Sequence, residues 1–252
     1  MKVNKPIVCR RVREEEYNRM FITSDEHYGS ERTLTLSRRP FDNTETMDKE
    51  MIKRFNSKVP ENGITIHNGD FGNMELLKEL NGEHILIWGN YEMVDFLNDP
   101  NSGRELPHYP REFLKNSNKW DFVRQTDPKM WSTILDIVSQ PMRVFNEYLK
   151  HKYGWKEVYP SFPIPIIAFM VESNMTTNYT LPTKVIRVTH KPEDCDKGEF
   201  NLYGHIHGRQ LVKTYGLDVG VDGHHFYPLS MKDDVSFFKT AIEEHYDDNV
   251  FE

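Results

Sequence analysis

Short apolar runs alternate with amphipathic segments in the first third of the chain. β-prone residues occupy Arg19–Ser24, Gly63–His67 and His84–Trp88. Between them, Thr44–Val59 places apolar side chains about 3.6 residues apart, which predicts an amphipathic helix, and Met74–Leu80 predicts a short one. This strand–helix–strand–helix–strand order is typical of βαβ units, so we expect a largely parallel inner sheet.

The rest of the chain is less regular. Residues Asp95 to about Asn118 are polar and include three prolines, which predicts a loop. Met130–Tyr153 predicts a helix that is interrupted or kinked at Pro141. Further β structure is predicted at Ile164–Glu172, Lys184–Thr189 and, with several glycines, Asn201–Val221. We therefore expect an α/β fold in a single domain over residues 1–252, with a largely helical insertion or cap at about 94–155.

Composition limits the class of protein. Hydrophobic residues make up 37% and charged residues 28% of the chain, as in an ordinary globular protein. The longest apolar stretch, near 164–171, is shorter than the ~20 residues that span a bilayer. The charged N-terminus lacks the apolar core of a signal peptide, and two cysteines are too few for a disulfide framework. We expect a cytoplasmic protein with no membrane partner, and the sequence predicts no particular oligomeric state.

Metal-capable side chains follow several of the predicted strands. They are Asp25 and His27, Asp70, Asn90, His190, and the pair His205 and His207. Residues at i and i+2 of an extended chain point to one face, so Asp25 with His27, and His205 with His207, could each present two ligands to one spot. Carboxylate, imidazole and amide oxygen suit divalent ions such as Mn²⁺, Fe²⁺, Zn²⁺ or Ni²⁺. Alone, each residue could be a turn or surface residue; their order at successive strand ends indicates a metal site.

The segments that carry these residues resemble a known family. TSDEHYG, HNGDFG, IWGNYE, THKP and YGHIHG, in this order, are similar to the calcineurin-like metallophosphoesterase superfamily, whose pattern is D-x-H, G-D, G-N-H-[D/E], H and G-H-x-H. RRPFDNTETMDKEMIKRFNSKV and LDVGVDGHHFYPLS resemble its small bacterial and phage branch in particular. The resemblance covers roughly Met20–Glu92 and Ile186–Asp234. It implies an α/β/β/α sandwich of two mixed sheets flanked by helices.

The resemblance also implies two divalent ions, with Mn²⁺ the first expectation and Fe, Zn or Ni as alternatives. It assigns one ion to Asp25, His27, Asp70 and His207. It assigns the other to Asp70, Asn90, His190 and His205, with Asp70 bridging. Two divalent cations, two carboxylates and a metal-bridging hydroxide leave a charge near +1, which attracts a phosphate. Asp70, Asn90 and His205 are then expected at the catalytic centre.

Two positions depart from the family pattern. Tyr91 stands where the family usually has a histidine that helps the leaving-group oxygen. A phenol can donate a hydrogen bond there but is a weaker acid than imidazolium, so Tyr91 is interpreted either as a leaving-group contact or as a packing residue. Some small prokaryotic relatives that lack this histidine are associated with phosphodiesters. Ser30 stands where close relatives often have histidine, which weakens the case for a phosphate contact from that position.

The leading interpretation is a metal-dependent phosphoester hydrolase, most simply a phosphodiesterase acting on a nucleotide or nucleic-acid-type substrate. The alternatives are a phosphomonoesterase, a non-catalytic metal-binding scaffold and a nucleic-acid-binding module without catalysis. The net charge of −7 opposes broad binding to nucleic acid but permits a local positive site.

Further residues have two interpretations each. Lys191 and Arg39 are candidate contacts to substrate phosphate. The aromatic residues of the middle segment could form the core of a cap or a base-stacking platform: Trp120, Phe122, Trp131, Phe145, Tyr148 and Trp155. That segment is expected either to shape substrate choice or only to bury one edge of the sheet. The remaining histidines weighed, His67, His84, His224 and His225, are interpreted as structural or exposed.

Overall fold

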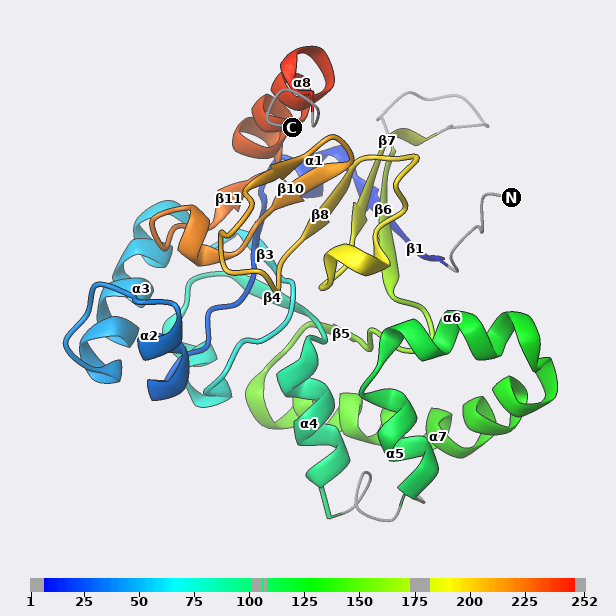
Figure 1. The fold of residues 1–252 in the computed structure, drawn as a ribbon. Coiled ribbons are helices and arrows are strands. Elements are labelled where there is room, and N and C mark those ends of the chain that lie inside the picture. The colour runs from blue at the N-terminus through cyan, green and yellow to red at the C-terminus, as the bar shows by residue number, and fades with distance from the viewer. Residues whose placement is uncertain (1–6, 101–105, 107, 173–181, 248–252) are drawn as a thin grey trace.

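Two mixed β-sheets form the centre of the molecule, and helices flank them (Figure 1). The computed structural model describes residues 7–100, 106, 108–172 and 182–247. The first sheet has the strand order β11-β2-β3-β4-β5, in which β2 to β5 are parallel and β11 is antiparallel to β2. Its strands are β2 (Met20–Thr23), β3 (Ile64–His67), β4 (Glu83–Ile87), β5 (Glu157–Tyr159) and β11 (Leu229–Ser230). The α/β class and the largely parallel inner sheet are therefore confirmed.

The second sheet has six strands in the order β1-β6-β7-β8-β10-β9. Its strands are β1 (Ile7–Arg13), β6 (Ile166–Glu172), β7 (Pro182–Val188), β8 (Asn201–Tyr203), β9 (Val212–Lys213) and β10 (Gly216–Asp218). Neighbours β7 and β8 are parallel, so their carboxyl ends lie at the same edge of this sheet. That edge carries the loops that follow each of the two strands.

Strands β2, β3 and β4 of the first sheet are buried on both faces. In β2, Ile22 packs between the two sheets with residues such as Phe169, whereas Phe21 faces the helical layer. In β4, Ile85 points between the sheets and Leu86 toward the helices. Alternate side chains of a strand point to opposite faces, so these short, almost wholly apolar strands are suited to burial on both sides.

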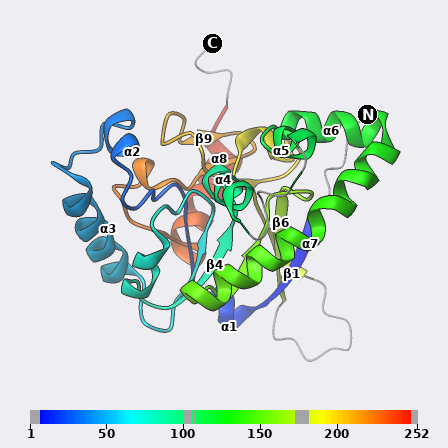
Figure 2. The same cartoon turned by 90° about the horizontal axis from the view of Figure 1, so that it is seen from below.

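Helices α4 to α7 connect β4 with β5 and gather at the end of the molecule away from α8 (Figure 1). The helix bounds are α1 (Glu14–Tyr17), α2 (Glu31–Leu36), α3 (Thr44–Lys58), α4 (Asn90–Asn98), α5 (His108–Leu114), α6 (Ser117–Thr126), α7 (Pro128–Tyr153) and α8 (Ser236–His245). Shorter helical turns are η1 (Met74–Glu79), η2 (Pro192–Asp194), η3 (Val221–Gly223) and η4 (Met231–Val235). Figure 2 shows α7 crossing this side of the molecule. Phe145 of α7 packs against Trp88 and Phe96, so these helices share the core of the first sheet.

The predicted loop from Asp95 to about Asn118 is wrong, because much of it is helical. Helix α4 extends to Asn98, and α5 and the start of α6 lie within the same stretch. Pro110 is the third residue of α5, in the first turn, where the backbone N–H has no partner within the helix and a proline costs little. Helix α7 continues through Pro141 rather than being interrupted there.

Strand β1 is absent from the sequence-based prediction. It is an edge strand that pairs in parallel with β6, and its sequence, IVCRRVR, is rich in arginine. Arg10 is held there by ion pairs with Glu16 and Glu157. Within the described residues, no helix combines the length and the hydropathy that crossing a membrane requires.

Candidate metal centre

Loops at the carboxyl ends of five strands converge at one place between the sheets. Asp25 and His27 follow β2, and Asp70 follows β3. Asn90 begins α4 just after β4. His190 follows β7, and His205 and His207 follow β8. The structure therefore brings together every predicted ligand.

Five of these residues have a left-handed backbone. The φ angles are 58° at Asp25, 51° at His27, 59° at Asp70, 73° at His205 and 51° at His207. Non-glycine residues seldom adopt this conformation, which costs of order 1–3 kcal/mol each and is concentrated at functional sites. The predicted reason for the pairing, two ligands on one face of an extended chain, is wrong, because all four residues have a left-handed backbone and lie outside the strands.

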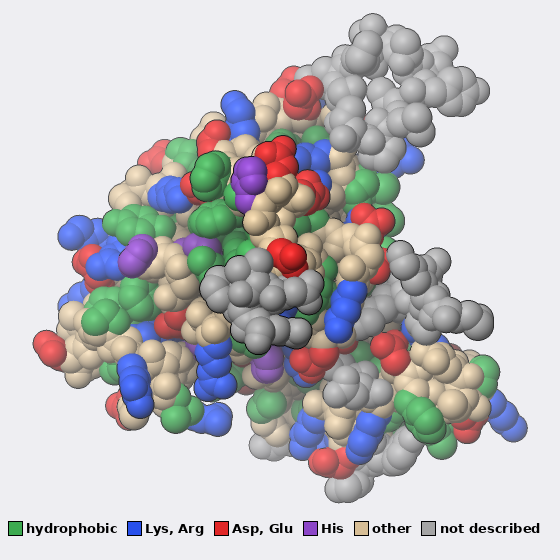
Figure 3. Space-filling view, turned by 45° about the horizontal axis from the view of Figure 1, so that its top comes forward, with side chains coloured by type: hydrophobic (Ala, Val, Ile, Leu, Met, Phe, Trp, Pro, Cys, Tyr) green, Lys and Arg blue, Asp and Glu red, His purple; other side chains and the backbone are tan. Residues whose placement is uncertain are grey.

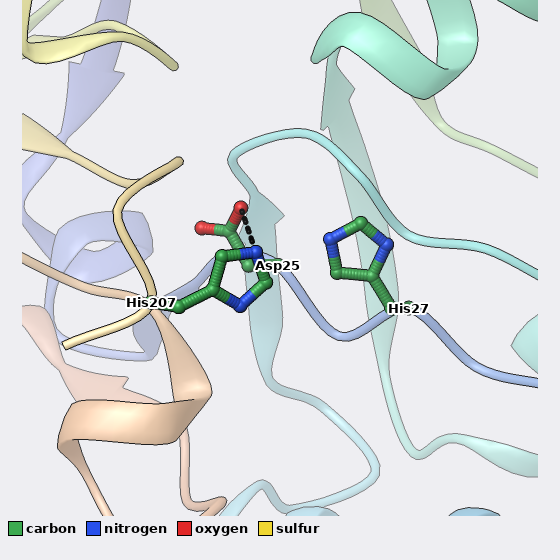
Figure 4. Close-up of side chains that lie close together, drawn as sticks. All are labelled: Asp25, His27 and His207. Carbon is green, nitrogen blue, oxygen red and sulfur yellow. Dashed lines mark ion pairs between the residues drawn. The ribbon is translucent and has the colours of Figure 1, made fainter. Parts of the chain in front are cut away.

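Six of the ligands form two groups, each with one carboxylate and two imidazoles. Asp25, His27 and His207 form the first group, which Figure 4 shows. Asp70, His190 and His205 form the second. In each group one potential ligand atom per residue lies within 4.8 Å of the others. His205 and His207 thus belong to different groups, as the resemblance implies.

Asp70 lies between the two groups. Its Oδ2 is 3.6 Å from Nε2 of His27 in the first group and 3.6 Å from Nε2 of His190 in the second. Its other oxygen, Oδ1, accepts a hydrogen bond of 2.9 Å from the backbone N–H of Tyr91, which fixes the orientation of the carboxylate. One carboxylate oxygen can therefore reach an ion in either group.

Several buried polar atoms of the first group have no hydrogen-bond partner among the described residues. They are Oδ1 of Asp25 and both ring nitrogens of His27. Leaving a buried polar group unsatisfied costs about 1–3 kcal/mol. Figure 4 shows the Asp25 carboxylate directed toward His207, whose Nε2 is 4.0 Å from Oδ1. A cation among these atoms would satisfy them together, so the residues fit a divalent ion.

The second group shows the same need for a positive charge. Nδ1 of His190 is 2.7 Å from the carbonyl oxygen of Asn68, which can only accept, so this nitrogen carries the proton of the neutral ring. Its Nε2 then presents a lone pair to Oδ1 of Asn90, 3.2 Å away, and to Asp70. A proton on Nε2 or a metal ion at the same point would resolve this contact between acceptors. Asn90 thus lies where the second ion was expected.

A further carboxylate orients His207. Oδ2 of Asp222 is 2.7 Å from Nδ1 of His207, which leaves Nε2 directed toward Asp25. Asp222 also receives two hydrogen bonds from the buried guanidinium of Arg39. Arg39 also donates hydrogen bonds to the carbonyl oxygens of Asp25 and Glu26. Partners of this kind commonly fix the tautomer of a metal-binding histidine. Arg39 is therefore a structural residue rather than the phosphate contact that was considered.

Glu92 joins the loops of the first sheet to one another. Its Oε2 accepts hydrogen bonds from the backbone N–H groups of Asp70 and Gly89, and its Oε1 accepts one from Phe71. Glu92 is the third residue of α4 after the N-cap, where an acidic side chain commonly satisfies free backbone donors. The sequence-based prediction gave Glu92 no role, although its position three residues after Gly89 is typical of an acidic residue that accepts from the backbone N–H of the N-cap.

Burial sets the protonation of several ligands. It lowers the pKa of His27 to about 3 and that of His205 to about 4, so both imidazoles are neutral at pH 7 and can act as ligands. Burial raises the pKa of Asp70 to about 7, although the charge of His190 opposes this shift. For His207, burial disfavours the protonated form, but the hydrogen bond with Asp222 and the charge of Asp25 outweigh it and raise the pKa.

Two clefts meet at the metal groups. The first, here called the metal cleft, has a volume of about 320 Å³ and is lined by Asp70, Tyr91 and the histidines His27, His205 and His207. The second, here called the apolar cleft, has a volume of about 140 Å³ and lies between the α4–α6 helices and His190. Asn90 is the single described residue that lines both. Tyr91 lies in the metal cleft, with its ring centroid 4.6 Å from that of His27.

The other candidates separate into buried and surface residues. Lys191 lines the apolar cleft next to His190. His67, His84 and His224 are buried and His225 is exposed. Of the middle-segment aromatics, Trp120, Phe145 and Trp155 belong to the core, Trp131 packs against it, and Phe122 and Tyr148 are exposed. Most of this set is therefore core.

Comparisons with known proteins give no function. No protein-family model matches the chain. An uncharacterized protein of Methanocaldococcus jannaschii, MJ1445, is 33% identical over 82 residues, which cover 29% of this chain and 47% of that protein. The chain thus spans about half the length of this curated relative. A solved structure from Aquifex aeolicus, of the protein of unknown function AQ665, is similar with a TM-score of 0.46 at 15% identity, covering 85% of this chain and 96% of that one.

Proposed function

We propose that this chain is a binuclear metallophosphoesterase of the calcineurin-like type that hydrolyses phosphodiesters of a nucleotide or nucleic-acid kind. The observation that supports this most is the place of Asp70, whose Oδ2 lies 3.6 Å from a histidine of each three-residue group. The two mixed sheets flanked by helices are compatible with the sandwich that such enzymes have. Residues of both groups, with Asn90, would hold the ions.

The chain's own residues would position the substrate and the leaving group. Two bound divalent ions would supply Lewis acidity toward a phosphoryl oxygen. Asp70 is held in one orientation by the backbone N–H of Tyr91, and His207 by Asp222. The Tyr91 side chain, in the wall of the metal cleft, would donate a hydrogen bond to the leaving-group oxygen.

Tyrosine at this position favours a diester over a monoester. Some small prokaryotic relatives of the family that lack the histidine at this position are associated with phosphodiesters, and a phenol is a weaker proton donor than imidazolium. We therefore expect faster hydrolysis of bis(p-nitrophenyl) phosphate than of p-nitrophenyl phosphate. The reverse order would favour the phosphomonoesterase alternative. The non-catalytic scaffold is disfavoured because each position of both groups carries a side chain able to bind a metal.

Metal binding should be stoichiometric and stabilising. We expect protein purified without chelator and titrated with Mn²⁺ to reach two ions per chain by elemental analysis. Because ions would satisfy the unpartnered atoms of Asp25 and His27, chelator treatment should lower the melting temperature, and Mn²⁺ should restore it. Saturation at one ion or at none would rule out the binuclear assignment.

The apolar cleft would receive the organic group of the substrate. Met93, Val94, Leu114 and Trp120 form its apolar wall, and Asn90 joins it to the metal groups. Helices α4 to α6 would thus shape substrate choice, while α7 provides core contacts such as that of Phe145 with Trp88. The two interpretations of the middle segment, a role in substrate choice and burial of the sheet, then apply to different helices.

Val94 offers a direct test of this cleft. Its side chain is 45% exposed, so Val94→Glu should not disturb the core. We expect this change to raise KM for substrates with an aromatic leaving group by roughly tenfold, the effect of placing a charge beside an apolar group of 1–2 kcal/mol transfer energy. Val144, 46% exposed on α7 and outside the lining of the cleft, provides the matched control Val144→Glu. Equal effects of the two changes would exclude a substrate role for the cleft.

A further inference from the structure

Three arginines line the metal cleft at its outer edge. Arg32 and Arg38 lie within and just after α2, and Arg209 follows the loop that carries His205 and His207. We call these three residues the arginine rim. All three are exposed, and none forms an ion pair with another described residue. The rim is thus an uncompensated positive surface beside the metal groups of a protein whose net charge is −7.

The local backbone directs one of these side chains into the cleft. Arg38 and Arg39 are consecutive, yet Arg39 is buried against Asp222 and Arg38 lines the cleft. Arg38 has a φ of 51°, a left-handed conformation that reverses the direction of the chain between them. A non-glycine residue in this conformation costs free energy, so it persists only where its surroundings hold it. As a result, the Arg38 side chain lines the cleft, and the next side chain, that of Arg39, is buried.

The lining of the metal cleft carries little negative charge that would repel an anion. Asp70 is its one acidic residue among those described, and it faces the two metal groups. The uncharged polar residues Thr33 and Ser37 also line it. On the face seen in Figure 3, Lys and Arg side chains lie close to histidine. Guanidinium groups form bidentate hydrogen bonds with phosphate, which makes them well suited to an anion outside the metal groups.

We infer that the arginine rim binds a second phosphate of the substrate, next to the phosphate that is hydrolysed. This inference rests on the proposed function, because it takes the scissile phosphate to lie at Asp70 and Asn90. Among the described residues, the apolar cleft and the metal cleft share only Asn90 in their linings. A substrate would therefore place its organic group along α4 and its additional phosphate toward α2. The second phosphate could belong to a nucleoside polyphosphate or to the next unit of an oligonucleotide.

Binding of nucleotides that differ in one phosphate tests this inference. Titration calorimetry should compare AMP, ADP and adenosine 3′,5′-bisphosphate, at equal free Mn²⁺ and again with chelator-treated protein. We expect one of the two-phosphate ligands to bind roughly 10- to 100-fold more tightly than AMP, the range for hydrogen bonds to charged groups. A preference for ADP would indicate a polyphosphate chain, and one for the bisphosphate a nucleic-acid strand.

Variants assign the preference to the rim. Arg38→Gln and Arg209→Gln should each reduce it by about tenfold, whereas Arg143→Gln, on the exposed side of α7, should leave it unchanged. Equal affinity for all three ligands, or a preference that both rim variants retain, would overturn the inference. Failure of the proposed function has a different signature. In that case no ions bind, while the arginine-dependent preference persists in the chelator-treated protein.

Discussion

Asp70→Asn should reduce hydrolysis of a diester to the level of chelator-treated protein. Asparagine has the same shape, and its amide oxygen can keep the hydrogen bond from the N–H of Tyr91. Its amide group then replaces Oδ2, the atom that lies 3.6 Å from both His27 and His190. A negative acceptor becomes a neutral donor at the point between the two groups. The change should remove several kcal/mol of transition-state stabilisation and at least one bound ion.

Tyr91→Phe is the matched comparison for this experiment. It removes one hydrogen-bond donor from the metal cleft, so the loss of kcat should not exceed ~10²–10³-fold, the effect of one transition-state hydrogen bond. Both proteins should be assayed with bis(p-nitrophenyl) phosphate and analysed for Mn²⁺ content. We expect two ions in Tyr91→Phe and fewer in Asp70→Asn. Full metal content and similar small losses in both would contradict the central place given to Asp70.

Glu92→Gln should destabilise the protein and weaken metal binding together. The carboxylate accepts hydrogen bonds from three backbone N–H groups, those of Asp70, Phe71 and Gly89. An amide can accept through its oxygen alone, and its NH₂ group would face the remaining donor or donors. Each buried donor left unsatisfied costs about 1–3 kcal/mol. Because Asp70 is one of the residues released, the loop that carries the bridging ligand loses its support.

Urea unfolding and Mn²⁺ titration would measure the two effects of this change. Glu147→Gln on the surface of α7 is a suitable control. Glu147 is exposed and pairs with Lys150 and His151 on its own helix, so this change should alter the free energy of unfolding by no more than about 0.5 kcal/mol. Because unfolding alone could explain lost activity, metal affinity should be measured where Glu92→Gln is folded. Normal affinity in a folded variant would show that Glu92 stabilises the helix without positioning Asp70.

Much of the first sheet could be predicted from the sequence because its strands are short, apolar and followed at once by polar residues. The ligand residues were found for the same reason, since a carboxylate or histidine directly after a buried strand is conspicuous. Strand β1 was missed because it lies at an edge, where arginines are tolerated when they are paired, as Arg10 is with Glu157. Helices α4 and α5 were missed because their prolines and asparagines lie at ends and first turns, where these residues are acceptable.

Other features could not be predicted from local sequence. The separation of His205 and His207 between two groups depends on left-handed turns at both residues, which no hydrophobic pattern reveals. The contacts of Arg39 and Asp222 join segments 183 residues apart, so only the folded structure brings them together. Likewise, the arginine rim exists because α2 and the loop after β8 line the same cleft.

The left-handed backbone of the ligand residues distinguishes selection for the fold from selection for the chemistry. Glycine would adopt the conformation of Asp25, His27, Asp70, His205 and His207 with little steric cost, as Gly69 and Gly208 do beside them. Backbone conformation alone would therefore favour glycine at these five positions. The acids and histidines found there carry a backbone cost that glycine would avoid. The identity of these five residues therefore reflects a requirement of the chemistry and not a requirement of the fold.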